Sequence, residues 1–231
     1  MSNEVLWLLF ALVNFLLITT AYKLFGKTGL FAWIALGTIL ANIQVLKSID
    51  LSVAGITLAA TLGNIMYGTL FLVTDALGEK YGIKDARRAV TIGFFSLITT
   101  VIVMSMALMF TPNEADFADG ALRTIFELVP GLAVASLVAY LASQFLDVYL
   151  FEKIKTKLPD KSFLWIRNNG STLISQFVDT SIFVSIALLF GVFPQSLARD
   201  IYITTYVIKV IVAMLDTPFV YWIKSIKPLS D

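Results

Sequence analysis

The same polar motif occurs twice within apolar stretches of this chain. Residues 143–151 read SQFLDVYLF and residues 175–183 read SQFVDTSIF. Each copy has Ser-Gln-Phe, an aliphatic residue, Asp and, four positions later, Phe. On an α-helix, residues three, four and seven positions apart share one face. The glutamine, the aspartate and the last phenylalanine of each copy are therefore predicted to form one stripe, with the serine beside them.

Each stripe would offer a carboxylate, an amide, a hydroxyl and an aromatic ring. This set suits a flat, nitrogen-rich heterocycle. A carboxylate accepts from ring and exocyclic N–H groups, an amide binds the adjacent edge, and a ring stacks on the face. The alternative is structural, because such side chains hydrogen-bond membrane helices to each other at about 0.6 kcal/mol per bond. Taken alone, Ser143, Gln144 and Ser175 are more simply explained in this second way.

Other polar side chains also lie in apolar segments. A charged residue inside a membrane costs at least about 2.5–3.5 kcal/mol, so each is a candidate for function. The ionisable residues are Asp75, Glu127, Asp147, Asp179, Lys209 and Asp216, and the carboxamides are Asn14, Asn42, Gln44, Asn64, Gln144 and Gln176. Glu127 either lines an access path or reaches the lipid headgroups, and the second interpretation is the simpler one.

Composition limits the classes of protein to which the chain can belong. Of its 231 residues, 58% are hydrophobic and 14% are charged, against about 25% charged residues in a soluble domain. The chain has no Cys and no His, which removes thiolate chemistry, the usual ligands of zinc and haem, and the ordinary neutral-pH proton shuttle. A net charge of +1 gives no sign of a nucleic-acid partner. We expect no metal and no cofactor.

Long apolar runs predict seven membrane-spanning helices, because about 20 apolar residues cross a bilayer. They cover Val5–Leu24, Thr28–Leu46, Leu51–Gly78, Ala89–Phe110, Leu122–Phe151, Leu173–Phe193 and Ile201–Trp222. The third and fifth are longer than needed, so they must tilt or bend. The third contains Gly55, Gly63, Gly68 and Gly78, which allow close helix packing or a break. Asn64 lies among these glycines, either in a packed interface or facing a cavity.

The positions of Lys and Arg predict the orientation of the chain. Thirteen Lys and Arg residues follow the first, third, fifth and seventh spans. They are Lys23, Lys27, Lys80, Lys84, Arg87, Arg88, Lys153, Lys155, Lys157, Lys161, Arg167, Lys224 and Lys227. The other side has Lys47, Arg123 and Arg199. Positive charge is retained in the cytoplasm. The N-terminus is therefore predicted outside and the C-terminus in the cytoplasm of a bacterial inner membrane.

The predicted spans also indicate how deep the polar residues lie. Asp179 in the sixth span and Lys209 in the seventh would reach similar depth, and a buried charge is normally paired. We therefore expect an Asp179–Lys209 ion pair, which serves either substrate binding or structure alone. Asp75 and Asp147 are expected near the inner interface. Together these positions predict a polar cavity among the third, fifth, sixth and seventh spans.

Four stretches resemble the queuosine precursor transporter family. They are TDALGEKYG (74–82), SQFLDVYLF (143–151), IRNNGSTLISQFVDT (166–180) and TPFVYWIK (217–224), and the resemblance extends from about Ala41 to Lys224. The occurrence of these stretches in this order is more specific to the family than any one of them alone. The family is related in fold to the substrate-binding subunits of energy-coupling-factor vitamin transporters.

This resemblance implies import of 7-cyano-7-deazaguanine, 7-aminomethyl-7-deazaguanine or both. It also implies an all-α fold, with a six-helix core at about residues 28–224 and an extra N-terminal helix at residues 5–24, in one domain spanning residues 1–231. The family's polar motif positions are Asp75, Glu79, Gln144, Asp147, Arg167, Asn168, Ser171, Gln176 and Asp179. Combined with the intramembrane residues, they give eight candidates for substrate binding: Asn64, Asp75, Gln144, Asp147, Asn168, Gln176, Asp179 and Lys209.

Two other functions are alternatives to import of a deazapurine. An integral-membrane enzyme is disfavoured, because the chain has no His-Glu-x-x-His and no nucleophile elbow. A substrate-binding subunit for another vitamin or purine-like solute, energised by a partner ATPase, stays open, since the chain has no phosphate-binding loop of its own. A homodimer is equally compatible with the sequence.

Overall fold

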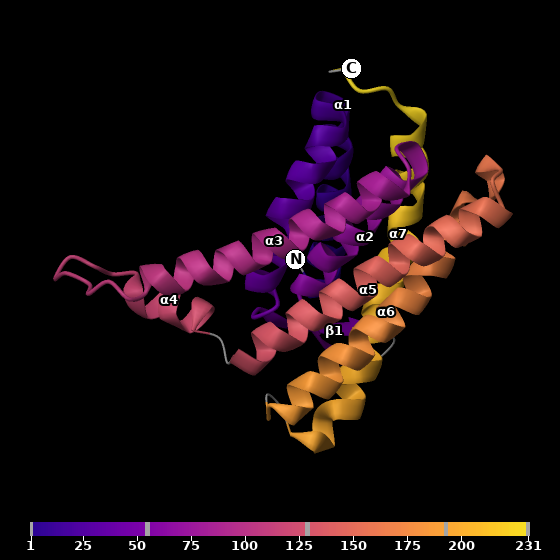
Figure 1. Ribbon diagram of the computed structural model, residues 1–231. Helices are drawn as coiled ribbons and strands as arrows, with labels where there is room; N and C mark the ends of the chain where they lie inside the picture. The colour runs from indigo at the N-terminus through magenta and orange to yellow at the C-terminus, as the bar shows by residue number, and fades with distance from the viewer. Residues whose placement is uncertain (1, 54–55, 128–129, 192–193, 230–231) are drawn as a thin grey trace.

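The computed structural model describes residues 2–53, 56–127, 130–191 and 194–229, which fold into a helical bundle (Figure 1). Its elements are α1 (Asn3–Gln44), β1 (Ser48–Val53), β2 (Ile56–Thr61), α2 (Gly63–Lys80), α3 (Ile83–Ala107), α4 (Asp119–Phe126), α5 (Pro130–Lys157), α6 (Leu164–Leu189) and α7 (Gln195–Ser225), with a 3-10 turn at Lys161–Phe163. Five helices are long and apolar enough to cross a membrane. The predicted all-α membrane bundle is confirmed.

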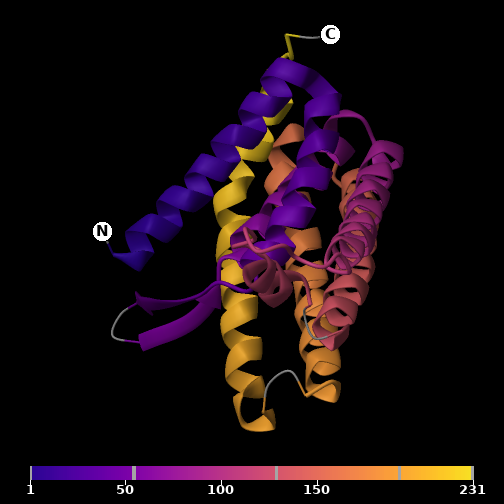
Figure 2. The ribbon, with the colours of Figure 1, turned by 90° about the vertical axis from the view of Figure 1, so that its left-hand side faces the viewer.

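A sharp kink divides α1 into two arms. Gly26 has φ 55° and ψ −139°, a conformation that a residue with a Cβ rarely adopts. The two arms diverge from this turn, one running to the N-terminus and the other back into the bundle (Figure 2). They correspond to the first two predicted spans, because Gly26 falls between Leu24 and Thr28.

The third predicted span, Leu51–Gly78, is wrong in its first part. Residues 48–61 form an antiparallel hairpin, with Ser48 opposite Thr61 and Val53 opposite Ile56. Apolar residues alternate with polar ones in SIDLSV, and this period of two is the pattern of a strand. Helix α2 therefore begins only at Gly63 and has 18 residues. Gly55 lies outside the described residues.

The fifth and sixth predicted spans have different boundaries in the structure. Residues 122–151 were predicted as one helix, but they belong to the short α4 and to α5, which begins at Pro130. Proline favours the first position of a helix, because it has no N–H to leave unpaired there. Helix α6 starts at Leu164, nine positions before the predicted Leu173, so that Asn168 is helical.

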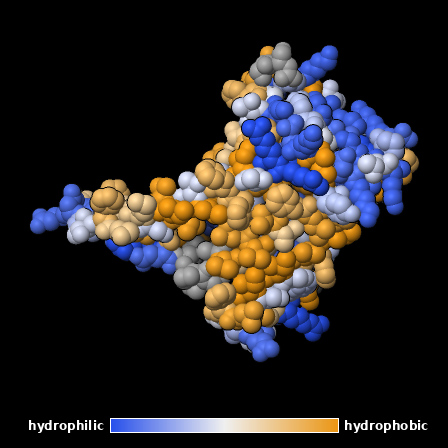
Figure 3. All heavy atoms as spheres, in the orientation of Figure 1, coloured by the Kyte–Doolittle hydropathy of each residue, from blue (hydrophilic) through white to orange (hydrophobic). Residues whose placement is uncertain are grey.

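The predicted basic loops lie together at one end of the bundle, here called the basic end. Lys27 forms an ion pair with Asp85 at 3.1 Å, and the Lys80 ammonium donates to the Ile223 carbonyl at 3.0 Å. The Leu229 amide donates to the Lys23 carbonyl at 2.8 Å. Hydrophilic residues gather at this end and apolar residues cover the middle of the molecule (Figure 3). The opposite end, with β1, β2 and α4, is called the hairpin end.

Close packing joins α2 to α7. A Cβ built on Gly68 would lie 2.2 Å from Cγ1 of Val212, so only glycine fits in this contact without a shift of the helices. An added Cβ would also be crowded at Gly63, by Val45, and at Gly37, by Leu70. Gly63 and Gly68 of the third predicted span therefore serve close helix packing, whereas Gly78 has ordinary contact distances around it.

We expect Gly68→Ala to lower the melting temperature of the purified protein by several degrees. The added methyl group overlaps Val212, and overpacking of this kind costs about 1–3 kcal/mol. The matched control is Gly170→Ala on α6, where the nearest atom is the flexible end of Ile154 at 3.4 Å. Thermal unfolding in detergent distinguishes the two, and equal stability of both variants would contradict the tight α2–α7 contact.

Candidate functional site

The two copies of the repeated motif bind each other. Helices α5 and α6 pack antiparallel, and the serine of each copy donates to the aspartate of the other. Ser143 Oγ lies 2.9 Å from Asp179 Oδ1, and Ser175 Oγ lies 2.8 Å from Asp147 Oδ1. All four residues are buried, with Asp179 the most exposed at 9%. Each buried carboxylate thus receives a hydroxyl donor from the opposite helix.

The expected Asp179–Lys209 ion pair is present in the structure. The Lys209 ammonium, from α7, donates to the second carboxylate oxygen of Asp179. Because Asp179 also accepts from Ser143, this carboxylate connects α5, α6 and α7. Both partners are buried inside the bundle, where an unpaired charge would be costly.

A second group of carboxylates lies nearer the basic end. Asp75 of α2 lies against Asp147, and Asp216 of α7 is close to both. The Asn168 amide donates to Asp216 Oδ1 at 3.0 Å. The exposed fractions of Asp75 and Asp147 are 1% and 0%. Neighbouring helices therefore cover both carboxylates, and their expected depth near the inner interface stays a prediction.

Two glutamines complete what we call the central polar cluster. Gln144 Oε1 accepts from the Thr74 hydroxyl at 3.4 Å, and Gln176 lies on α6 one turn before Asp179. The cluster consists of Thr74, Asp75, Ser143, Gln144, Asp147, Asn168, Ser175, Gln176, Asp179, Lys209 and Asp216. Several of its buried polar atoms have no hydrogen-bond partner among the described residues: both oxygens of Asp75, Asp147 Oδ2, Gln144 Nε2, Asn168 Oδ1, and Nε2 and Oε1 of Gln176.

An ion-pair network closes the basic end of the cluster. The Arg167 guanidinium donates to both carboxylate oxygens of Glu79, at 2.9 and 2.6 Å. Lys224 also donates to Glu79, and the Lys155 ammonium lies 3.8 Å from it. A bidentate arginine fixes the orientation of a carboxylate as well as its charge. Glu79 therefore joins α2 to α5, α6 and α7 at this end.

The structure does not bring every predicted residue into the cluster. Asn64 is buried in the first turn of α2, about three turns before Asp75 and towards the hairpin end. Phe151, expected to stack on a ligand, instead packs against Gly78, with ring carbons 3.5 Å from the position of an added Cβ. The other seven candidates lie in the cluster. Asp216 also lies in the cluster, although it is not among the eight candidates for substrate binding. Its spacing of seven residues from Lys209, which puts both on one helix face, could have indicated this.

The comparisons with known proteins agree with the architecture. A sequence model of the family described as "Putative vitamin uptake transporter" matches residues 61–223, most of the chain. This class of membrane transporter fits a helical bundle with a buried polar cluster. No solved structure matches.

Three relatives carry a more specific description. A "Probable queuosine precursor transporter" of Bacillus subtilis (strain 168) is 44% identical over 231 residues, covering 100% of this chain and 99% of that protein. A protein of the same description from Haemophilus influenzae is 29% identical over 55% of this chain and 52% of its own length. The "Queuosine precursor transporter" of Escherichia coli (strain K12) is 27% identical over 67% of each chain. The chain therefore belongs to the queuosine precursor transporter family, and it is a transporter, not an enzyme.

We expect Lys209→Met to lower the free energy of unfolding more than the double substitution Lys209→Met with Asp179→Leu. The single change leaves the Asp179 carboxylate buried without its cation, which typically costs about 3–5 kcal/mol, whereas removing both charges is often nearly neutral. Thermal unfolding and the yield of folded protein in membranes measure the difference. A double variant no more stable than the single one would show that the pair contributes nothing.

Proposed function

We propose that the protein imports a queuosine precursor, 7-cyano-7-deazaguanine or 7-aminomethyl-7-deazaguanine, across a bacterial cytoplasmic membrane. The names of the three relatives support the substrate class, and the identity to the Bacillus subtilis protein extends over the whole chain. The heterocycle binds in the central polar cluster. The observation that carries this proposal is the set of buried carboxylate and amide atoms without a partner among the described side chains.

The chemistry of the base complements these atoms. A deazaguanine presents a ring N–H and an exocyclic amine on one edge, which a single carboxylate accepts together. Asp75 and Asp147 each have an oxygen free for this role within the described structure. The carbonyl oxygen of the base needs a donor, and Gln144 Nε2 and Gln176 Nε2 are buried N–H groups of this kind. In the aminomethyl form, the added cation is neutralised by the second carboxylate.

The energetics favour a ligand here over helix packing alone. A buried polar atom without a partner costs about 1–3 kcal/mol, and the cluster contains several. Ser143 and Ser175 do hold helices together, as the simpler interpretation expected. Gln176 differs, since neither of its side-chain polar atoms bonds to another described residue. A base that satisfies these atoms recovers the energy that their burial costs.

The distribution of charge supports one orientation of the bundle in the membrane. The basic end collects most of the Lys and Arg residues of the connecting segments, and the positive-inside rule assigns that end to the cytoplasm. The C-terminus then lies inside and the hairpin end outside. The Glu79 network closes the cytoplasmic end of the cluster in this conformation.

We expect Gln176→Leu to reduce binding of 7-cyano-7-deazaguanine by the purified protein at least tenfold, with little change in melting temperature. The leucine removes two buried atoms that bond to no described side chain, so the fold loses nothing, whereas the base loses a hydrogen-bonding partner. Gln44→Leu at the end of α1 is the same chemical change outside the cluster, and it should bind normally. Guanine and a B vitamin serve as competing ligands.

Isothermal titration calorimetry with the wild-type protein decides first whether a deazaguanine binds at all. If the folded protein binds neither form of the base, the proposed substrate is wrong. If Gln176→Leu binds the base as well as wild type does, the transporter assignment is unaffected, but the site lies elsewhere.

A further inference from the structure

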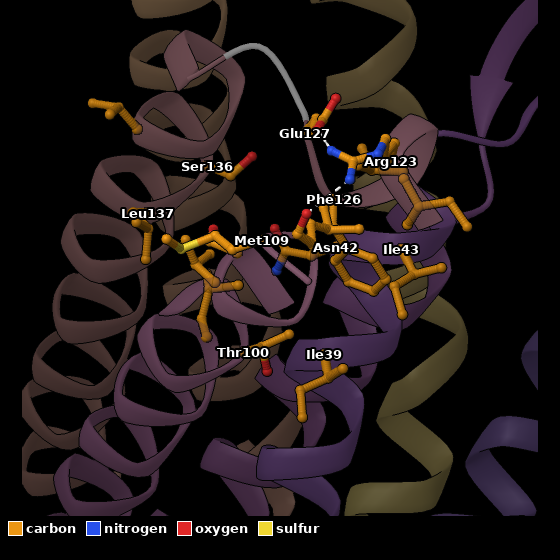
Figure 4. Close-up of a pocket in the computed structure, with 17 residues that line it drawn as sticks. Ile39, Asn42, Ile43, Thr100, Met109, Arg123, Phe126, Glu127, Ser136 and Leu137 are labelled. Atoms are coloured by element: carbon orange, nitrogen blue, oxygen red, sulfur yellow. Dashed lines mark hydrogen bonds and ion pairs between the residues drawn. The ribbon is translucent and has the colours of Figure 1, made fainter. Parts of the chain in front are cut away.

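A cavity of about 680 Å³ opens at the hairpin end, between the second arm of α1, α3, α4 and α5. Its walls are mostly apolar, with Phe126 at one side and Leu137 at another, and a few polar groups face it from different helices (Figure 4). These include the Asn42 amide and the hydroxyls of Thr100 and Ser136. The volume lies within the range of small-molecule sites, about 300–1,000 Å³.

Arg123 holds the outer wall of this cavity in place. Its guanidinium forms ion pairs with Asp119 at 2.7 Å and with Glu127 at 2.6 Å, and it donates to the Leu108 carbonyl at 2.8 Å. The two ion pairs lie along α4 itself, and the bond to Leu108 fixes α4 to the end of α3. Glu127, which the sequence placed either on an access path or at the headgroups, lines the cavity.

Tyr67 of α2 lies between this cavity and the central polar cluster. Asn42 and Ser136, which both line the cavity, lie beside the Tyr67 hydroxyl. On the cluster side, the Lys209 ammonium is 5.9 Å from the centre of the Tyr67 ring, and Asp179 is close enough to interact with it. The same aromatic side chain therefore borders the cavity wall and the ion pair.

We propose that this cavity is the external site at which the planar heterocycle first binds, and that Tyr67 is the barrier it passes to reach the cluster. This inference rests on the proposed import of a deazaguanine. The flat faces of such a base suit the apolar walls and Phe126, and its polar edge suits the Asn42 amide, which both donates and accepts. Movement of one aromatic ring would then connect the cavity to Asp179 and Lys209.

The absence of cysteine from the 231-residue sequence makes a direct test possible. In Ser136→Cys, the introduced thiol is the only one in the chain. Reconstituted in vesicles with the hairpin end outward, it should react with a membrane-impermeant, cationic methanethiosulfonate reagent. Saturating 7-cyano-7-deazaguanine should slow this reaction at least tenfold. Phe117→Cys, at a 98% exposed position between α3 and α4 that does not line the cavity, is the matched control, and the base should not change its rate.

A second pair of variants tests the barrier. Ser143→Cys lies on the cluster side and is fully buried, so it should react slowly with the external reagent. Adding Tyr67→Ala should speed that reaction at least tenfold, whereas adding Tyr67→Phe, which keeps the ring, should not. If the Ser143→Cys thiol reacts at the same rate with Tyr67→Ala as with Tyr67→Phe, Tyr67 is not the barrier.

The outcomes separate this inference from the proposed function. If the vesicles take up the base but Ser136→Cys is unreactive, or reacts equally with and without the base, the external site is wrong and import stands. If the wild-type protein neither binds nor transports the base, the proposed function fails and the external site for that base fails with it.

Discussion

Burying carboxylates in an apolar bundle is the constraint on which the rest of this structure depends. A carboxylate removed from water needs donors supplied by the protein. Helices α5 and α6 meet this need reciprocally, because Ser143 donates to Asp179 and Ser175 donates to Asp147. The two residue pairs are arranged about a local twofold relation between antiparallel helices. The repeated motif therefore encodes a symmetric contact between two helices, in which each carboxylate accepts from a hydroxyl of the opposite helix.

From this contact, polar groups continue in both directions along the bundle. Towards the hairpin end, Asp179 pairs with Lys209, and Tyr67 follows between that pair and the cavity. Towards the basic end, Asp147 lies against Asp75, Asp216 bonds to Asn168, and the Glu79 network follows. The sequence thus places a continuous series of hydrogen-bonding groups through an otherwise apolar protein. Such an arrangement suits a transporter of a small polar molecule better than it suits a purely structural bundle.

Sequence reasoning succeeded where one physical signal dominated. Apolar runs located the helices, the basic loops did gather at one end, and the need to pair a buried charge gave Asp179–Lys209. The prediction was wrong for residues 51–61. Their hydrophobicity alone predicts a helix, but residues 48–61 form an antiparallel hairpin, and polar and apolar residues alternate in its first strand. Sequence reasoning also could not find the cavity, because Asn42, Ser136 and Arg123 come from three helices whose approach depends on packing. The sequence alone also does not predict the burial of Asp75 and Asp147, because it depends on how several helices pack together.

The Glu79 network has a consequence for how the molecule can change shape. One carboxylate on α2 is contacted by cations from α5, α6 and α7, so its neutralisation is shared among three helices. Moving α5, α6 or α7 alone leaves Glu79 with two cations and releases only one charge to be hydrated. Separating α2 from all three of these helices exposes a carboxylate and three cations at once. The basic end therefore tolerates small displacements of α5, α6 or α7, yet opens fully only in a concerted step whose cost falls as ionic strength rises.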